Sequence, residues 1–280
     1  MPHLSCDKPQ AVISDRSSLV QNDCIAKNTF RLRLLAPGIA PLVKPGQFVM
    51  LRLPDRSDPL LGRPLAVYRT GSEGSLEVVY LVVGKMTARL AELPAGAPVD
   101  IWGPLGNGFE AAGYDQIIMV AGGIGQTPFL MLTKQWVEQH GPGSATLLFG
   151  VRSKDRICCV DDFREAGAKV LLATDDGSEG YHGPVTQLLP KVFSEANSTI
   201  NRTKVLCCGP LPMLRSAFLE CQKLGLPCDV SLESPMACGL GICFSCVVEY
   251  RRDDSNYEYV RTCSEGPVFD AYRLKMTDAG

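Results

Sequence analysis

The stretch IIMVAGGIGQTPFL, residues 117–130, decides the fold of this chain. It opens with an apolar run that is typical of a buried strand and continues with three closely spaced glycines. Thr127 and Pro128 then suit the N-cap and the first position of a helix, and apolar side chains recur at helical spacing as far as Trp136 and Val137. A buried strand, a glycine turn and a helix in this order predict the start of a parallel α/β sheet.

The glycine turn is also a candidate nucleotide site. Gly122, Gly123 and Gly125 would let the backbone approach a pyrophosphate, and the N-terminus of the following helix would add partial positive charge. Pro128 stands where the dinucleotide fingerprint has its third glycine, so a purely structural tight turn is the alternative.

The same rhythm of strands and helices continues on the C-terminal side. Strands are expected at residues 145–149, 170–173, 205–208 and 229–232, and helices near 186–193 and 212–224. We therefore predict a doubly wound parallel-sheet domain over residues 112–229. The turn Cys208-Gly-Pro-Leu-Pro-Met213 falls at the carboxyl end of one of these strands, where such sheets bind ligands, although Gly209 and the prolines would equally stop a strand.

Before residue 112 the pattern changes to short apolar runs separated by Pro and Gly turns. The runs at 30–35, 48–53 and 76–83 predict a small antiparallel barrel domain over residues 1–111, with one short helix at 87–93. Arg63-Pro-Leu-Ala66 and Gly84-Lys-Met-Thr87 would offer a flavin a guanidinium, an extended backbone and a helix N-terminus. A surface arginine and a capping threonine are the plainer interpretations.

Four cysteines near the end of the chain predict a metal centre. Cys238, Cys243 and Cys246 have the C-x4-C-x2-C spacing of plant-type [2Fe-2S] ligands, and Cys263 would be the fourth thiolate. A zinc site and a group of buried structural thiols are the alternatives, but no second closely spaced pair follows, as structural zinc usually requires. The segment 230–280 is then a small [2Fe-2S] domain in which the metal substitutes for a core.

Composition excludes several classes of protein. The formal charge of −2 shows no basic excess, so no nucleic acid is expected as a partner. No run of eighteen apolar residues and no signal-peptide pattern occur, which predicts a cytoplasmic protein without a membrane span. In a reducing compartment the other eight cysteines are expected to be core thiols for the most part; they are Cys6, Cys24, Cys158, Cys159, Cys207, Cys208, Cys221 and Cys228.

The order of these motifs is more specific than any one of them. A barrel with Arg-Pro-Leu-Ala, a Gly-Pro-Leu-Gly-Asn-Gly-Phe109 hinge, a Gly-Gly-Ile-Gly turn, Cys-Gly-Pro-x-Pro-Met and the terminal cysteines resembles the ferredoxin reductase superfamily. Within it, residues 173–178, 236–243 and 263–269 resemble the electron-transfer subunits of dihydroorotate dehydrogenase B, and the match covers nearly the whole chain.

The resemblance implies FAD, one [2Fe-2S] cluster and NAD as cofactors, and an FMN-containing catalytic subunit as partner in a heterotetramer of two of each. Electrons from dihydroorotate would pass through the cluster and FAD to NAD+, in pyrimidine (UMP) biosynthesis. One alternative is a diaphorase subunit of a hydrogenase or of a ferredoxin-NAD(P) reductase complex, and another is a zinc-stabilised binding protein. NAD and NADP are not distinguished, because Arg152 follows a strand where it could meet a 2′-phosphate.

The resemblance also assigns site residues, none of them catalytic. The flavin positions are Arg63, Pro64, Leu65, Ala66, Val79, Tyr80, Leu81, Met86 and Thr87. The nicotinamide positions are Gly122, Gly123, Gly125, Thr127, Cys208, Gly209 and Pro210. The cluster ligands are Cys238, Cys243, Cys246 and Cys263. Three flavin positions depart from the family pattern: Ala66 stands where serine is common, Leu81 replaces a frequent arginine, and Met86 replaces a frequent glycine.

Overall fold

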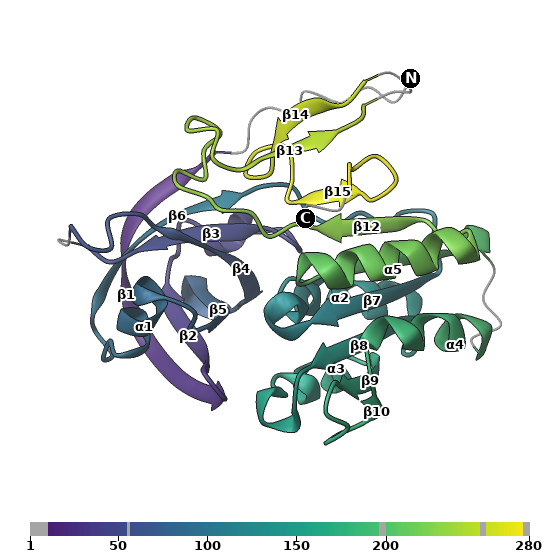
Figure 1. Ribbon diagram of the computed structural model, residues 1–280. Coiled ribbons are helices and arrows are strands. Elements are labelled where there is room, and N and C mark those ends of the chain that lie inside the picture. Colours follow the sequence, from purple (N-terminus) through teal and green to yellow (C-terminus); the bar gives the residue numbers. More distant parts are fainter. Residues whose placement is uncertain (1–10, 55–56, 196–199, 253–255, 277–280) are drawn as a thin grey trace.

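The computed structural model describes residues 11–54, 57–195, 200–252 and 256–276. The chain folds into three parts. Figure 1 shows the purple and blue barrel next to a teal and green sheet, and the yellow C-terminal segment lies across both.

The N-terminal part is a closed six-stranded antiparallel barrel, which confirms the prediction. Its elements are β1 (Ile13–Ala26), β2 (Thr29–Leu35), β3 (Phe48–Arg52), β4 (Arg63–Thr70), β5 (Ser75–Leu81), α1 (Lys85–Ala91) and β6 (Pro98–Leu105). The strands neighbour one another in the order β1-β2-β5-β4-β3-β6. Alternate side chains fill the interior, such as Leu32 and Leu34 on β2 and Val78 and Tyr80 on β5.

The second part is a seven-stranded sheet with helices on both faces. Its elements are β7 (Gln116–Gly122), α2 (Phe129–His140), β8 (Ala145–Val151), α3 (Val160–Glu165), β9 (Lys169–Thr174), β10 (Tyr181–His182), α4 (Leu188–Glu195), β11 (Thr203–Cys208), α5 (Leu211–Leu224), β12 (Cys228–Ser231) and β15 (Val268–Asp270). The strand order is β10-β9-β8-β7-β11-β12-β15, and all neighbours are parallel except the last pair.

The alternation of side chains on β7 explains the double winding. Ile117 and Met119 pack in one core with residues of α2 and α3, whereas Ile118 and Val120 pack in another with residues of α4 and α5. Because both faces are covered, the central strands are apolar throughout, as the sequence of residues 117–121 predicts.

The helix α2 begins later than predicted. Thr127 does not cap it, because residues Gly123–Gln126 first form a 3-10 turn and Pro128 occupies the N-cap position. The positive φ of Gly123, 56°, tightens the chain into this extra turn. The expectation that Pro128 is the first helical residue is therefore wrong by one position.

The remaining cysteines are mostly core thiols, as predicted. Five of the eight are buried, namely Cys158, Cys207, Cys208, Cys221 and Cys228, while Cys159 is half-buried. Cys24 is exposed, because β1 faces solvent along much of its length. Cys6 lies outside the described residues.

The C-terminal segment adds a two-stranded sheet, β13 (Val247–Tyr250) and β14 (Glu258–Arg261), and is fastened to the barrel. The Asn107 side chain accepts a hydrogen bond from the backbone N–H of Val268 at 2.9 Å and donates to its carbonyl at 2.8 Å. The Trp102 indole N–H donates to the carbonyl of Cys238 at 2.9 Å. The predicted hinge, residues 103–109, thus anchors the end of the chain.

Charged groups join the barrel to the sheet. The Arg31 guanidinium of β2 lies 2.5 Å from the carboxylate of Asp162 on α3, and the Tyr68 hydroxyl of β4 donates to the same carboxylate at 2.6 Å. These contacts fix the relative position of the two parts that flank the site. Within the described ranges, no helix is long and apolar enough to cross a membrane.

Candidate functional site

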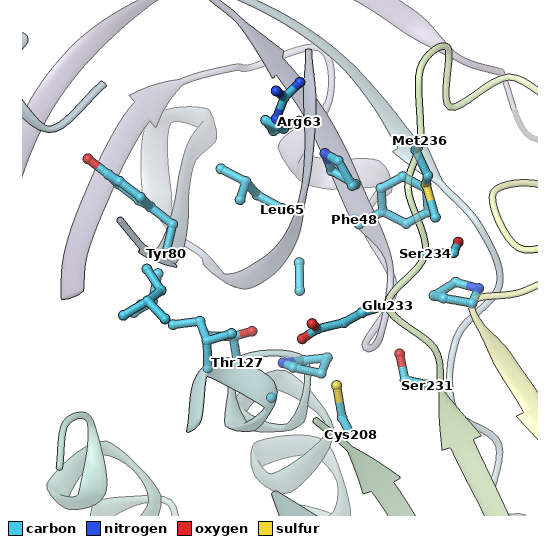
Figure 2. A pocket seen from close by; sticks show the side chains of 18 of the residues that line it. Phe48, Arg63, Leu65, Tyr80, Thr127, Cys208, Ser231, Glu233, Ser234 and Met236 are labelled. Atoms are coloured by element: carbon cyan, nitrogen blue, oxygen red, sulfur yellow. The ribbon is translucent and has the colours of Figure 1, made fainter. Parts of the chain in front are cut away.

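A cavity of about 550 Å³ lies where the three parts of the chain meet. Strands β4 and β5 and helix α1 supply one wall, the glycine turn after β7 supplies a second, and residues 231–236 supply a third. Figure 2 shows Arg63 and Leu65 on the barrel side, Thr127 and Cys208 at the sheet, and Met236 on the C-terminal segment. A cavity of this size can bury a large part of an organic cofactor.

All of the predicted flavin positions line this cavity. They are Arg63, Pro64, Leu65, Ala66, Val79, Tyr80, Leu81, Met86 and Thr87. The barrel brings them together because β4 and β5 are hydrogen-bonded neighbours and α1 follows β5 directly. Sequence reasoning alone could not supply that pairing.

Their side chains differ in what they present to the cavity. The Arg63 guanidinium donates to the carbonyls of Leu61 and Gly62, which holds it at the rim. Tyr80 points away into the barrel, where its hydroxyl lies 3.2 Å from Asn22, so it offers the cavity only its backbone. The Thr87 hydroxyl caps α1 by accepting from the N–H of residues 83 and 84.

The predicted nicotinamide positions are divided between two places. Gly125, Thr127 and Cys208 line the main cavity, whereas Gly209 and Pro210 line a second cavity nearby. Gly122 lies directly beneath Gly209 and lines neither cavity. Gly123 also lies outside both; it is exposed, and a Cβ added there would meet nothing within 4 Å.

The other glycines have a packing reason as well. A Cβ on Gly125 would lie 2.5 Å from the carbonyl carbon of Cys208, and one on Gly122 would lie 2.6 Å from the sulfur of Met213. These glycines let the turn after β7 approach the turn after β11. Both turns end parallel strands, so they form the crevice at which such sheets bind ligands.

Sequence reasoning missed the residues at the end of β12 and just after it. Ser231, Glu233, Ser234 and Met236 all line the main cavity, and the Ser234 hydroxyl is buried without a hydrogen-bond partner within the described ranges. Their position after the carboxyl end of a predicted parallel strand was the available signal.

Three of the predicted cluster ligands lie on one loop, and Cys263 lies in the turn that follows β14. The backbone N–H of Leu240 donates to the Cys238 sulfur at 3.3 Å, and that of Gly241 donates to the Cys263 sulfur at 3.1 Å. Gly239 has a φ of 71°, which lets the loop turn its amides inward. Such amide donors are characteristic of cluster-binding loops.

The thiols interact with one another: Cys243 with Cys238, and Cys263 with both Cys246 and Cys238. Hydrogen bonds, first from Ser245, lower the pKa of Cys243 to about 6, whereas burial raises the pKa of Cys263 to about 12. In the part of the chain that is described, no three His, Cys, Asp or Glu side chains converge closely enough to hold a metal ion.

The residues present nonetheless fit the two groups that the resemblance implies. Four thiols with inward amides are the donor set of an iron–sulfur cluster, since thiolates are its usual ligands. The main cavity combines the apolar wall of Pro64, Leu65 and Ala66 with a buried, unpartnered hydroxyl on Ser234, which suits a flat ring with polar edges.

A closed antiparallel barrel beside a doubly wound sheet, with a shared cavity and a cysteine loop, defines the chain as a reductase of the ferredoxin reductase class. Two family models match it: the iron-sulfur cluster binding domain of dihydroorotate dehydrogenase B at residues 233–275, and the oxidoreductase NAD-binding domain at residues 119–218.

Proteins with similar sequences identify the family within this class. The dihydroorotate dehydrogenase B (NAD(+)) electron transfer subunit of Desulforamulus reducens is 34% identical over 89% of this chain and 94% of its own length. The corresponding subunit of Geobacillus kaustophilus is 37% identical over 92% of this chain and 96% of its own length. The chain belongs to the family of dihydroorotate dehydrogenase B electron transfer subunits, which confirms the resemblance seen in the sequence.

Solved structures agree on the fold. A structure of an NADH-dependent reduced ferredoxin-NADP oxidoreductase, studied for flavin-based electron bifurcation, has a TM-score of 0.81 at 30% identity and covers 94% of this chain and 90% of that one. A ferredoxin NADP+ reductase from Neisseria gonorrhoeae with bound FAD and NADP has a TM-score of 0.62 at 17% identity. It covers 76% of this chain and 92% of that one. The alternative of a diaphorase or ferredoxin-NAD(P) reductase subunit is not favoured, because the curated relatives carry the dihydroorotate dehydrogenase name.

Proposed function

We propose that this chain carries electrons from dihydroorotate to NAD+ as one subunit of a dihydroorotate dehydrogenase B complex, in pyrimidine (UMP) biosynthesis. Its cofactors are FAD, one [2Fe-2S] cluster and NAD. Bound in the main cavity, a flavin would exchange single electrons with the cluster and a hydride with nicotinamide.

One observation carries the proposal. Phe48 and Met236 line the main cavity and also belong to the small core that contains Cys246 and Cys263. This small core therefore extends from the lining of the predicted flavin site to two of the predicted cluster ligands. Two groups held at either end of one small core are placed to exchange electrons.

The barrel would hold the flavin. Strand β4 presents Arg63, Pro64, Leu65 and Ala66 along the cavity, with the guanidinium at the rim, where it can meet a phosphate. Ala66 offers no hydroxyl, so the buried hydroxyl of Ser234 from the opposite wall is the candidate donor to the ring.

The sheet would hold the nicotinamide nucleotide. Gly123 leaves open space beside the turn after β7, and Gly125, Thr127 and Cys208 continue from that turn into the main cavity. A nucleotide on this turn would thus direct its reactive end toward the flavin.

The cysteine loop would also bind the partner, an FMN-containing catalytic subunit, in a heterotetramer of two of each. Leu240, Ile242 and Phe244 are exposed by 44%, 74% and 61%, and Cys243 is exposed among them. Apolar side chains gathered around a redox centre are suited to a protein partner that delivers electrons there.

The complex would work in the cytoplasm. The eleven cysteines of the described residues are all free, which suits a reducing compartment.

Reconstitution tests this proposal. The purified chain is mixed with a dihydroorotate-oxidising FMN subunit, and NAD+ reduction by dihydroorotate is followed. We expect reduction to require both proteins and to fall at least tenfold with Ile242→Asp or Phe244→Asp, whereas Leu219→Asp, on the exposed side of α5, leaves it unchanged. Co-purification with a nickel protein or a second flavoprotein instead, and no NAD+ reduction with the FMN subunit, would contradict the proposal.

A further inference from the structure

Cys158 and Cys159 are adjacent thiols that the proposed electron path does not use. They lie where α3 begins, at the junction between the sheet and the barrel, and Arg31 of β2 and Tyr68 of β4 reach Cys159 from the barrel side. Cys158 is buried and Cys159 is half-buried. The Arg31 side chain beside Cys159 is 24% exposed, so the edge of this junction is open to solvent.

The surroundings of Cys159 favour its thiolate. The Arg31 guanidinium donates to the Cys159 sulfur at 3.4 Å. Hydrogen bonds, first from Cys158 and then from Arg31 and Tyr68, outweigh burial and lower the pKa of the Cys159 thiol to about 6. The hydrogen bond to Cys159, together with burial, raises the pKa of Cys158. At neutral pH the pair is therefore a thiolate beside a thiol, which is the arrangement of an oxidisable cysteine with its resolving partner.

The backbone at this pair is unusual. Cys159 has a φ of 63°, in the left-handed region that residues with a Cβ rarely adopt. Such a conformation persists only where the surroundings impose it, and it is most common at functional sites. The peptide bond between the two cysteines is trans, which sets their Cα atoms about 3.8 Å apart, closer than the roughly 4.4–6.8 Å that is usual in a disulfide. A disulfide here would be strained and easily reduced, as labile regulatory disulfides are.

Cys158 connects the pair to the glycine turn after β7. The Gln126 side-chain amide donates to the Cys158 sulfur at 3.8 Å, and Gln126 is the last residue of the 3-10 turn Gly123–Gln126. Gln126 is fully buried, and its amide oxygen has no hydrogen-bond partner among the described residues. A disulfide would turn the Cys158 sulfur toward Cys159 and remove this contact. Because unpaired polar atoms in the interior are costly, Gln126 and the turn that carries it would have to move.

We propose that Cys158 and Cys159 are a redox modification site, where a peroxide oxidises the two thiols to a disulfide and thereby weakens binding of the nicotinamide nucleotide at the turn after β7. The oxidation itself is independent of the proposed function, whereas its effect on the nucleotide rests on that function. A peroxide suits the site because it is small enough to enter a junction that is open only at its edge.

Atoms and electrons balance in two steps. The Cys159 thiolate attacks one peroxide oxygen and the O–O bond breaks; the other oxygen takes a proton from solvent and leaves as water or an alcohol, and Cys159 becomes a sulfenic acid. The Cys158 sulfur then attacks the Cys159 sulfur, the S–O bond breaks, and the hydroxyl group leaves with the Cys158 proton as water. The two sulfurs have given two electrons to the peroxide. A dithiol reductant reverses the reaction by thiol–disulfide exchange.

Peptide mass spectrometry of the full chain with its bound cofactors tests the oxidation. Trypsin releases residues 157–164, which contain Cys158 and Cys159 and no other cysteine. When free thiols are blocked before digestion, the wild-type peptide should carry two blocking groups before peroxide, none after it, and two again after dithiothreitol. Cys158→Ser should stop at a sulfenic acid that dimedone traps on Cys159, and Cys159→Ser should form neither product. Cys24→Ser, which removes an exposed cysteine of β1, is the matched control and should behave as wild type.

NADH oxidation with a dye that accepts electrons from the flavin tests the consequence. We expect peroxide to raise the KM for NADH of the wild type by about fivefold or more, which is the usual range for coupling between two sites, and dithiothreitol to restore it. Cys159→Ser should keep the same KM before and after peroxide. Any loss that wild type and Cys159→Ser share arises from damage to the cofactors and not from this pair.

Two results would overturn the inference: a wild-type peptide 157–164 that keeps both thiols free after peroxide, or a disulfide that leaves the KM for NADH unchanged. A wild-type protein that binds no flavin, or that does not oxidise NADH before peroxide is added, would instead contradict the proposed function itself.

Discussion

Replacing Gly125 with alanine tests the close approach of the turns that follow β7 and β11. The added Cβ would lie 2.5 Å from the carbonyl carbon of Cys208 and 2.8 Å from the amide nitrogen of Gly209. Both obstacles are backbone atoms that cannot rotate away, so the turns must separate. Overpacking of this kind costs about 3 kcal/mol, the upper end of the usual range, because no side chain can yield.

Gly123→Ala in the same turn is the matched control. Its Cβ meets nothing within 4 Å, so only the left-handed backbone, with a φ of 56°, opposes the change. That conformation costs about 1 kcal/mol for an alanine. The methyl group would, however, enter the open space that we assign to the nucleotide.

Thermal unfolding of the protein with its cofactors separates the two effects. We expect the midpoint to fall by roughly 6–12 °C for Gly125→Ala and by roughly 2–4 °C for Gly123→Ala. The KM for NADH should rise in Gly123→Ala despite its smaller loss of stability. Equal losses of stability, or an unchanged midpoint in Gly125→Ala, would refute the packing of these turns.

Three further predictions concern the junctions between the parts. Asn107→Ala removes three hydrogen bonds to the backbone of the C-terminal segment. It should lower the free energy of unfolding, measured by urea titration, by about 2–4 kcal/mol. A change below about 0.5 kcal/mol would show that Asn107 does not anchor this segment. Trp102→Phe removes the indole donor to the cysteine loop, and we expect a chelator to extract iron several-fold faster; an unchanged rate would count against that bond. Burial acts to raise the pKa of Asp162, but the hydrogen bond from Tyr68 and the Arg31 charge outweigh it and lower the pKa. A lowered pKa means that this stabilisation is complete above the ordinary carboxyl range and is lost as pH falls through the folded value. The difference in thermal midpoint between wild type and Asp162→Asn should therefore shrink from pH 7 to pH 3, and a constant difference would show that the charge is not responsible.

The sequence was most informative where one chemical requirement acts on neighbouring residues. The apolar run before Gly122 had to be a strand covered on both faces, and the spacing of Cys238, Cys243 and Cys246 indicated cluster ligands on one loop. Local preference was less reliable at the start of α2, because a short turn with glycine geometry displaced Thr127 from the cap.

The remaining features depend on contacts between distant segments. Strand β15 has only three residues, too few to show a periodic pattern, and its antiparallel pairing with β12 follows from the anchor at Asn107. Glu233 and Ser234 were missed for a similar reason, since they become part of the cavity only when the C-terminal segment folds back over the barrel.

An iron–sulfur cluster beside the main cavity is the centre of the proposed electron path. Electron paramagnetic resonance of the anaerobically purified, dithionite-reduced protein should give a [2Fe-2S] signal, with two irons and two labile sulfides per chain, and Cys243→Ser should abolish or alter it. A silent spectrum from a protein that contains zinc in place of iron and sulfide would contradict it.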